Sequence, residues 1–528
     1  MGGLASERVT LSNSKEANPG EYVREVNGID FFRVGFEGHI TTPQIFDLSP
    51  ISHAGINTLP RSIIVNVGGS AATPEVYFML SGSSGTAPRV VEVELSAATY
   101  QAIVTDISAH AGHDFTTIPS TSTGYWGEDV IIYRVGPTNY LFYTWNDNVD
   151  GDVGRATVAG ASPDDDFMSQ ASGGPAGYAA LYLGVPHIFA EGADRKLYVT
   201  NRNYVSSFDG DTGANGTFDV DAYNLGPGWI ATDVKKFGNL LAIASVNMVG
   251  TIIPIGQDFA FSAGTMVTLW NMTESGLGLV RPVNDNGVTA IFPYFNNLYA
   301  FSNGKGSTGK ISKLVGERFE VIWESSVYNN KVDPRSIDVY KGLIYFVSGT
   351  NILAFDPKRE AVHHVAVLND GTNDVSSTVT SGASGVGFLK NTYATDLRAS
   401  GLFSATYQAV TLRYTTGSYS TANHDLRTKL YQLPYNSNIT KIQVFFSQLA
   451  SGGSARLSLF EGYDDSSIGG AADLLDETIS NAVHGAIDEY EITGSALGNI
   501  QLSSFYMNIR NTGQVSIREI LIFWEPSR

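Results

Sequence analysis

A phrase of short strands recurs along the first 400 residues, and it constrains the fold more than any other feature of the sequence. Each copy has an apolar strand, a turn with Gly or Asn, a second strand with Leu or Ile beside Tyr or Ala, and a third strand. The clearest copies are Ile230–Ser245, Thr289–Ser302, Ser336–Ser348 and His187–Thr200, with looser ones at Ser62–Leu80 and Val130–Trp145. A chain built in this way is all-β.

The spacing of the copies indicates how these strands are assembled. They begin near residues 62, 130, 187, 230, 289 and 336, and are therefore 43 to 68 residues apart. A meander of three or four strands cannot bury both of its faces alone, so each copy needs neighbours. We therefore predict a β-propeller of six or seven four-stranded blades over residues 26–415, with residues 20–50 or 385–415 supplying a strand that closes the ring. Stacked β-sandwiches are the alternative.

The residue composition and strand pattern outside the repeats differ from those within them. Residues 369–384 are rich in Gly, Ser, Thr and Asn, which marks a boundary. Residues 416–528 contain six to eight expected strands without the repeated phrase, and this pattern predicts a β-sandwich or jelly-roll domain. Residues 1–25 are polar and are expected to form an N-terminal arm.

Composition excludes several classes of function. The chain of 528 residues has no Cys, so it has no disulfides, thiolate metal sites or cysteine nucleophile. It has 33 basic and 52 acidic side chains, and a net charge of −19 opposes general binding to nucleic acid or anionic membranes. No apolar run is long enough to span a membrane and no secretory signal is visible, so we expect no membrane insertion and synthesis in the cytoplasm.

Two loops rich in Asp and Asn are the best candidates for metal binding. Residues 145–152 place oxygen-bearing side chains at alternate positions before a Gly, as the first half of a calcium loop does. Thr157 stands where such a loop needs a bidentate Glu. Residues 209–221 also carry several Asp. Turns stabilised by Asn and Asp are the preferred explanation of both loops, so no metal ligand or cofactor is assigned.

Candidate catalytic groups are few and poorly arranged. Asp164–Asp166 and Asp464–Asp465 are acidic turns, and adjacent loop carboxylates lack the defined separation that a glycosidase needs. Gly82–Gly85 matches a nucleophile elbow only with altered spacing. His110 and His113 chelate a metal only on a helical turn with further ligands, and His363 and His364 lie on opposite faces of a strand. We therefore assign no catalytic residue and expect a protein that is not an enzyme.

The aromatic residues admit two interpretations. Those within the repeated strands, Trp229, Trp270, Trp323, Tyr345 and Phe346, are expected to pack between blades. In the C-terminal domain Tyr431, Tyr435, Tyr463 and Trp524 either pack in the core or form a platform that stacks on sugars.

Taken with the polar N-terminus and the sandwich-like C-terminus, the repeated phrase resembles the β-propeller proteins of bacteriophage tails, of the nozzle or tail-hub type. This resemblance implies a structural protein of the virion that forms a homo-oligomeric ring and contacts adaptor and fibre proteins. It also implies that DNA passes without sequence-specific binding. The alternative is a carbohydrate-binding or carbohydrate-active propeller with a sugar-binding sandwich. A surface adhesin with calcium loops is a third possibility.

Overall fold

The computed structural model describes part of the chain, namely residues 5–8, 25–27, 40–41, 44–50, 60–65, 75–80, 89–95, 102–106, 126–146, 151–158, 167, 187–209, 217–247, 264–273, 278–283, 287–303, 308–325, 328–329, 332–340, 342–348, 351–367, 388–392, 396–400, 410–419, 423–428, 430–461, 474–497 and 500–526. Two compact units are present. The smaller comprises Met1–Asp47, Asn351–Val367 and Thr415–Arg528, and the larger comprises Leu48–Thr350 and Leu368–Tyr414.

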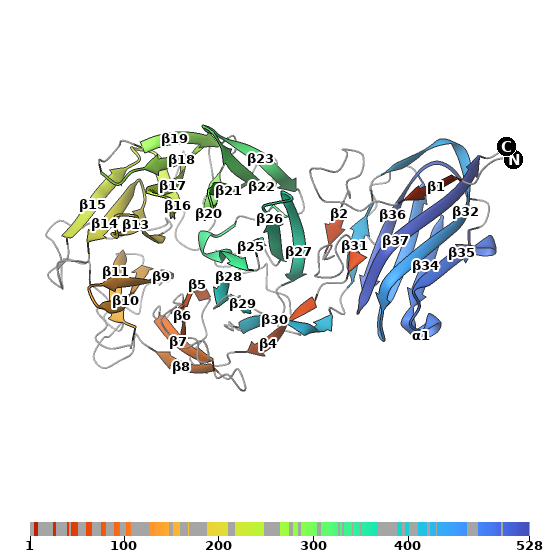
Figure 1. Ribbon diagram of the computed structural model, residues 1–528, viewed down its shortest axis with the longest axis horizontal. Coiled ribbons are helices and arrows are strands. Elements are labelled where there is room, and N and C mark those ends of the chain that lie inside the picture. Colours follow the sequence, from red (N-terminus) through yellow and green to blue (C-terminus); the bar gives the residue numbers. More distant parts are fainter. Residues whose placement is uncertain are drawn as a thin grey trace, which may run out of the picture. The chain divides into compact units, whose positions relative to one another are not determined.

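Five sheets have the regular form expected of a blade, with four consecutive antiparallel strands each (Figure 1). Their strands are β5 (Pro60–Val65), β6 (Glu75–Leu80), β7 (Arg89–Leu95) and β8 (Ala102–Asp106); β12 (Phe189–Glu191), β13 (Leu197–Asn201), β14 (Tyr204–Asp209) and β15 (Thr217–Asn224); β16 (Trp229–Phe237), β17 (Leu240–Asn247), β18 (Thr265–Trp270) and β19 (Gly278–Val283); β20 (Val288–Tyr294), β21 (Asn297–Asn303), β22 (Gly309–Val315) and β23 (Arg318–Ser325); and β24 (Ile337–Tyr340), β25 (Leu343–Ser348), β26 (Asn351–Asp356) and β27 (Ala361–Val367).

Two further sheets of the same series are irregular. One has three strands, β9 (Trp126–Val135), β10 (Thr138–Asn146) and β11 (Gly151–Thr157). The other joins β28 (Phe388–Thr392), β29 (Asp396–Ser400) and β30 (Val410–Tyr419) to β4 (Gln44–Pro50), a strand from far earlier in the chain. The expectation that residues 20–50 or 385–415 complete the ring is therefore confirmed. We expected six or seven blades; five sheets have the four consecutive strands of a blade, and these two depart from that pattern.

Contacts between the first strands of successive sheets close the series into a ring. β5 contacts β9, β9 contacts β12, β12 contacts β16 and β16 contacts β20, while β28 contacts both β24 and β5. The short 3-10 helix η3 (Pro334–Ser336), which precedes β24, contacts β20, β28 and β5. The propeller fold predicted from the repeats is confirmed.

The apolar cores lie between neighbouring sheets, as the alternation of side chains along each strand requires. On β17, Leu241 and Ile243 join a cluster with residues of β12–β15, such as Tyr198. Ala242 and Ala244 of the same strand join a second cluster with Ile291 and other residues of β20–β23. Each sheet therefore buries both faces only when it has a neighbour on each side.

The smaller unit contains one ten-stranded sheet that folds back on itself as a sandwich. Its strands are β1 (Ala5–Arg8), β2 (Glu25–Asn27), β3 (Ile40–Thr41), β31 (His424–Arg427), β32 (Tyr431–Leu449), β33 (Ser454–Glu461), β34 (Leu475–Ser480), β35 (Glu489–Thr493), β36 (Gln501–Thr512) and β37 (Val515–Pro526), with helices α1 (Asn481–His484) and η4 (Gly494–Ala496).

The long strand β32 connects the two layers of this sandwich. Its first half pairs with β36, and after a register shift between Gln432 and Ser437 its second half pairs with β37 and β35. Val444 on the second half and Leu457 on β33 belong to one buried core, so the two layers face each other across it. The predicted C-terminal β-sandwich is confirmed, although hydrogen bonds run continuously from one layer to the other.

The N-terminal residues lie in this same unit. β1 pairs with β37 in the register Ala5 with Trp524, β2 pairs with β31, and β3 pairs with β37. β1, β2 and β3 therefore belong to the sheet of the smaller unit, whereas the sequence predicts an arm over residues 1–25 and a propeller that begins at residue 26. The reason is that β37 has an open edge, which a polar segment satisfies with its main-chain hydrogen bonds.

Candidate functional site

Three first strands of the propeller carry the same dipeptide, Asp-Val, at the same place. The residues are Asp129 of β9, Asp233 of β16 and Asp338 of β24, which are 104 and 105 residues apart. In each, carboxylate Oδ1 accepts the N–H of the following Val, at 2.9 Å for Val130 and 2.8 Å for both Val234 and Val339. Asp129 and Asp233 are buried.

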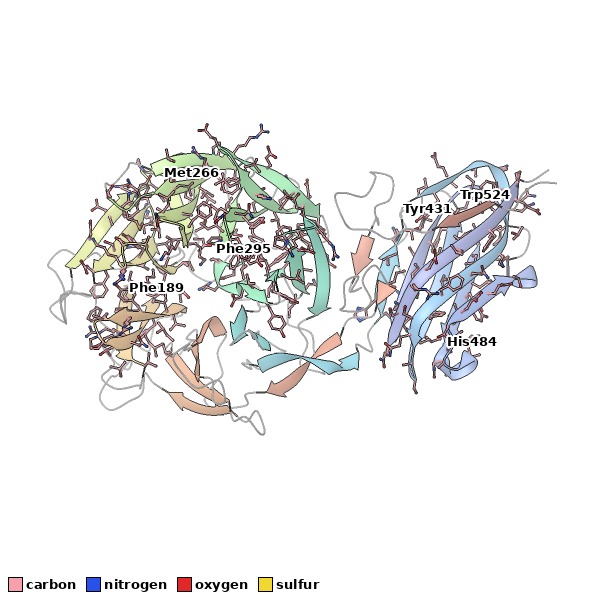
Figure 2. All side chains as sticks on the ribbon, viewed as in Figure 1. Phe189, Met266, Phe295, Tyr431, His484 and Trp524 are labelled. Atoms are coloured by element: carbon pink, nitrogen blue, oxygen red, sulfur yellow. The ribbon has the colours of Figure 1, made fainter. Side chains whose placement is uncertain are left out.

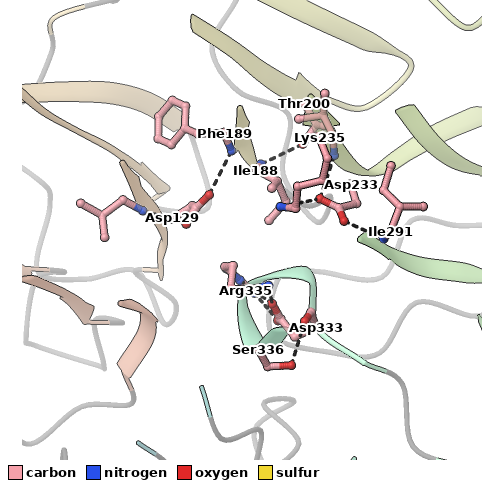
Figure 3. A network of polar contacts seen from close by, with 12 residues as sticks. Asp129, Ile188, Phe189, Thr200, Asp233, Lys235, Ile291, Asp333, Arg335 and Ser336 are labelled. Carbon is pink, nitrogen blue, oxygen red and sulfur yellow. Dashed lines mark hydrogen bonds and ion pairs between the residues drawn. The ribbon is translucent and has the colours of Figure 1, made fainter. Parts of the chain in front are cut away.

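The second carboxylate oxygen reaches the first strand of the next sheet (Figure 3). Oδ2 of Asp129 accepts the N–H of Phe189 on β12 at 3.0 Å, and Oδ2 of Asp233 accepts the N–H of Ile291 on β20 at 2.8 Å. Each carboxylate therefore joins two sheets, and it does so through a donor on the first strand of the next sheet, which has a neighbouring strand in its own sheet on one side only. Hydrogen bonds from N–H groups to an ionised carboxylate are stronger than bonds between neutral groups.

Register shifts accompany the Asp233 bridge in both of the strands that it joins. The register between β16 and β17 shifts between Ala231 and Asp233, and the register between β20 and β21 shifts between Val288 and Ala290. A bulge leaves an extra residue outside the ladder, so its polar groups need other partners. At Thr232 the hydroxyl donates to the Val288 carbonyl at 2.8 Å, again across the sheet boundary.

Asp233 also forms an ion pair. Lys235 Nζ lies 3.0 Å from Asp233 Oδ1, and the Lys235 side chain is 24% exposed whereas that of Asp233 is fully buried. Burial raises the pKa of Asp233 to about 6, although Lys235 and the N–H groups of Ile291 and Val234 act in the opposite direction. At neutral pH the carboxylate is ionised, and its two oxygens are occupied by these donors.

His187 lies close to Asp129, and it too binds main chain. Its ring Nδ1 lies 3.0 Å from the Thr200 carbonyl oxygen and therefore carries the proton that it donates. Thr144 links the main chains of Asp129 and His187. Its Oγ1 accepts the Asp129 N–H at 3.0 Å and donates to the His187 carbonyl at 3.3 Å. His187 is fully buried.

A second charged pair lies on η3. Asp333 caps this turn by accepting the Arg335 N–H at 2.9 Å, and its carboxylate also accepts from the Arg335 guanidinium, at 2.7 Å from Nε. The side chains are 14% and 6% exposed, respectively. Since η3 contacts β5, β20 and β28, this bidentate pair stiffens a turn that lies inside the ring (Figure 3).

Sequence reasoning missed this set of aspartates. A signal was present, because the Asp-Val dipeptide recurs at nearly constant spacing, two sheets apart, inside the repeated phrase. The dipeptide is too short to stand out without the alignment of blades that the structure provides.

The two loops considered for calcium are only partly described. Asn146 and Gly151 pair across the hairpin of β10 and β11, and residues 147–150 lie outside the described residues. Asp209 ends β14 opposite Thr217, Asp219 is exposed on β15, and residues 210–216 are not described. Within the described ranges, no group of three or more His, Asp or Glu side chains is placed to hold a metal ion.

Several other candidates lie outside the described residues, namely Gly82–Gly85, His110, His113, Asp164–Asp166, Asp464–Asp465 and Tyr463, and the side chain of Tyr435 is not described. His363 and His364 occupy successive positions of β27, paired with Ala354 and Leu353.

The aromatic residues that are described mostly pack in the interior. Trp270, Trp323, Tyr345 and Phe346 are buried, and Trp270 lies edge-on to Tyr198 with ring centroids 5.7 Å apart. In the sandwich, Tyr431 is buried and stacks on Phe505, with ring centroids 5.3 Å apart, while Trp524 packs against the core. Of the two interpretations of these residues, packing in the core holds for Tyr431, which faces the interior.

No family model matches the chain, and no curated protein matches it. Solved structures with a similar fold include a streptogramin B lyase, at 11% identity over 70% of this chain and 98% of that chain, with a TM-score of 0.41. The WD40 β-propeller domain of Doa1 has 10% identity over 71% and 98%, with a TM-score of 0.41. The SapL1 lectin in complex with alpha methyl fucoside has 9% identity over 60% and 100%, with a TM-score of 0.34.

These similarities concern the fold. A propeller fold by itself does not decide between catalysis and binding. Among the described residues, no helix is long and apolar enough to cross a membrane.

Proposed function

We propose that this chain is a non-enzymatic structural protein of a virion, which assembles into a ring around the path of DNA as a tail nozzle or hub component. The observation that supports the proposal most directly is the use of the buried carboxylates of Asp129 and Asp233. Both accept main-chain N–H groups from a neighbouring sheet, so they hold blades together. A catalytic carboxylate instead keeps an oxygen free for substrate or proton transfer.

The net negative charge of the chain suits a surface that DNA passes without binding to it. A net charge of −19 repels phosphate groups, and the basic side chains are scattered rather than gathered in one stretch of the sequence. A rigid ring is also required, because a passage must keep its diameter while DNA moves through it. The carboxylate bridges between blades and the capped η3 turn provide such rigidity. Partners would be further copies of the chain, adaptor proteins and fibres, in the virion tail.

Electron microscopy and sedimentation of the purified protein test this proposal. We expect closed rings of one size, with a central passage, at micromolar concentration. Filter binding to double-stranded DNA at physiological salt is expected to be no stronger than that of an acidic control protein. A protein that stays monomeric at every concentration, or that retains DNA in the filter assay, would contradict the proposal.

One observation favours a carbohydrate-binding function as the second candidate. On the outer layer of the sandwich, the Gln443 amide donates to Glu489 at 2.8 Å and to Glu491 at 3.1 Å, and these groups are partly or fully exposed. Phe445 on β32 and Phe523 on the neighbouring strand β37 lie on the same face of the sheet, half-buried. Carboxylates, an amide and aromatic rings on one flat surface are the groups that proteins use to bind sugars. Binding on a glycan array that is lost in Gln443→Ala would favour this function.

A further inference from the structure

The outer edge of β37 is completed by two separate segments from the beginning of the chain. β32 pairs along one side of β37 over its whole length. On the other side, β3 pairs with Ser516 and Ile517, and β1 pairs with residues 521–524. β1 therefore lies beside Trp524, near the end of the strand (Figure 2). The edge is covered in two pieces, and these pieces differ in how they are attached to the rest of the unit.

β3 is held by a side chain as well as by its main chain. Ile40 is fully buried in the core of the sandwich, and its carbonyl oxygen accepts from the Asn511 amide at 3.2 Å. Two residues, Thr42 and Pro43, separate β3 from β4 in the sequence. β3 is therefore fixed by packing and by a very short connection, and it has little freedom to reach another copy of the chain.

β1 is attached by a much longer connection. Its four residues are Ala-Ser-Glu-Arg, a polar sequence whose pairing with β37 runs through the main chain. Residues 9–24 connect it to β2, which pairs with β31 at the opposite end of the strand order. These sixteen residues span about 50 Å when extended, whereas a small domain is about 30 Å across. The connection is therefore long enough to reach the β37 edge of a neighbouring copy.

The edge that β1 covers is unfavourable to leave open. Residues 521–524 are Leu-Ile-Phe-Trp, of which Ile522 is fully buried and Leu521 and Phe523 are half-buried. An apolar strand with unpaired main-chain groups pairs readily with another chain. A second copy carries an identical β1, which forms the same ladder on this edge. Exchange of β1 therefore conserves these hydrogen bonds, and the connection and the local concentration of edges decide between the two arrangements.

We propose that β1 is exchanged between copies of this chain, so that residues 5–8 of one copy complete the β37 edge of the next. Each copy then gives one strand and receives one, and such contacts between unlike surfaces close into a ring when the rotation allows it. Within a ring, the edge of the neighbour is held at high effective concentration near the connection. This inference rests on the proposed function, because it names the contact that links the copies of the ring.

Cysteine cross-linking tests the exchange directly, because the chain has no Cys of its own. The variants Ser6→Cys and Phe523→Cys, at positions that are partners in the ladder, are expressed together in equal amounts and oxidised. A specific disulfide between two chains then forms only where β1 of one copy lies on β37 of another. We expect about a quarter of the contacts between neighbours to be cross-linked, since half of the copies carry each Cys. Each variant oxidised alone measures disulfides from chance collisions, and few are expected.

Thr41→Cys and Ser516→Cys are the matched control on the same edge. They are partners in the ladder of β3, which is fixed within its own chain. Their mixture is expected to give no cross-linked pairs of chains, and the double variant is expected to form a disulfide within one chain. Arg8→Cys with Leu521→Cys repeats the test at a second pair of partners, which leaves Phe523 in place.

The remaining outcomes separate this inference from the proposed function. Rings in which the double variant with Ser6→Cys and Phe523→Cys forms disulfides only within single chains would overturn the exchange and leave the ring proposal standing. Cross-linked pairs of chains that form no ring would support the exchange and contradict the ring. A protein that stays monomeric at every concentration, with disulfides inside one chain only, would overturn both.

Discussion

Asp233 accepts the main-chain N–H of Ile291 across the boundary between two sheets, with a distance of 2.8 Å from carboxylate oxygen to nitrogen. Asp129 makes the same bond to Phe189 one pair of sheets earlier. The geometry therefore repeats with a period of two sheets. In both places the buried carboxylate lies beside a register shift in its own strand, and it accepts from the first strand of the next sheet. Because the bond recurs at two sheet boundaries, it belongs to the repeated structure of the propeller and is not particular to one sheet.

Replacing Asp233 is expected to destabilise the propeller strongly. Asp233→Ala leaves the Ile291 N–H and the Lys235 ammonium without their buried partner, so we expect a loss of about 3–5 kcal/mol in the free energy of unfolding. Denaturant unfolding followed by fluorescence measures it. Glu320→Gln is the control, because the Arg318–Glu320 pair is largely exposed and its loss is expected to cost less than about 1 kcal/mol. Equal losses in the two variants would contradict the structural role of Asp233.

Stability is expected to depend on pH through Asp233. Its pKa in the folded protein is about 6, above its ordinary value of 3.8, so between these values the folded state binds more protons than the unfolded state. The free energy of unfolding therefore falls as pH rises from about 4 to 6, by up to about 3 kcal/mol from this group. The difference between the original protein and Asp233→Asn, measured by urea unfolding at each pH, isolates this contribution. Lys235→Met is expected to move the fall to higher pH, and a difference that does not vary with pH would refute the assignment.

Phe295→Gly is expected to leave the protein as stable as before or to stabilise it by up to about 1 kcal/mol. The reason is that Gly adopts a φ of +51° without the steric cost that a Cβ incurs. Thermal unfolding at a concentration where the protein is monomeric measures this effect. A loss greater than about 1 kcal/mol would mean that the ring of Phe295 contributes to folding.

Gly154→Ala is expected to destabilise the three-stranded sheet. Gly154 on β11 lies directly opposite Tyr143 on β10, and a Cβ there would overlap the Tyr143 ring, which is buried. Overpacking of this kind costs about 1–3 kcal/mol. The same substitution in a Tyr143→Leu background is expected to cost less, and a double-mutant cycle measured by chemical unfolding detects the difference. Additive effects would show that the ring moves aside freely.

The all-β class, the propeller and the C-terminal sandwich followed from the sequence, because strand alternation and repeat spacing are local properties. Repeats such as Ile230–Ser245 and Thr289–Ser302 correspond closely to β16–β17 and β20–β21. The same local reasoning left the calcium loops and the aromatic platform open, since an Asp-rich turn or a Tyr in a strand has the same sequence whether it binds a ligand or not.

Other features were decided only by tertiary structure. The strand that completes the last sheet, β4, comes from residues 44–50, and the partner of β37 is β1, more than 500 residues away in the chain. Asp233 and Ile291 are 58 residues apart and meet because two sheets pack side by side. The sequence by itself determined which segments are strands and that they must stack. The tertiary structure decided which carboxylate reaches which donor, because a hydrogen bond depends on positions in space, and sequence periodicity does not specify them.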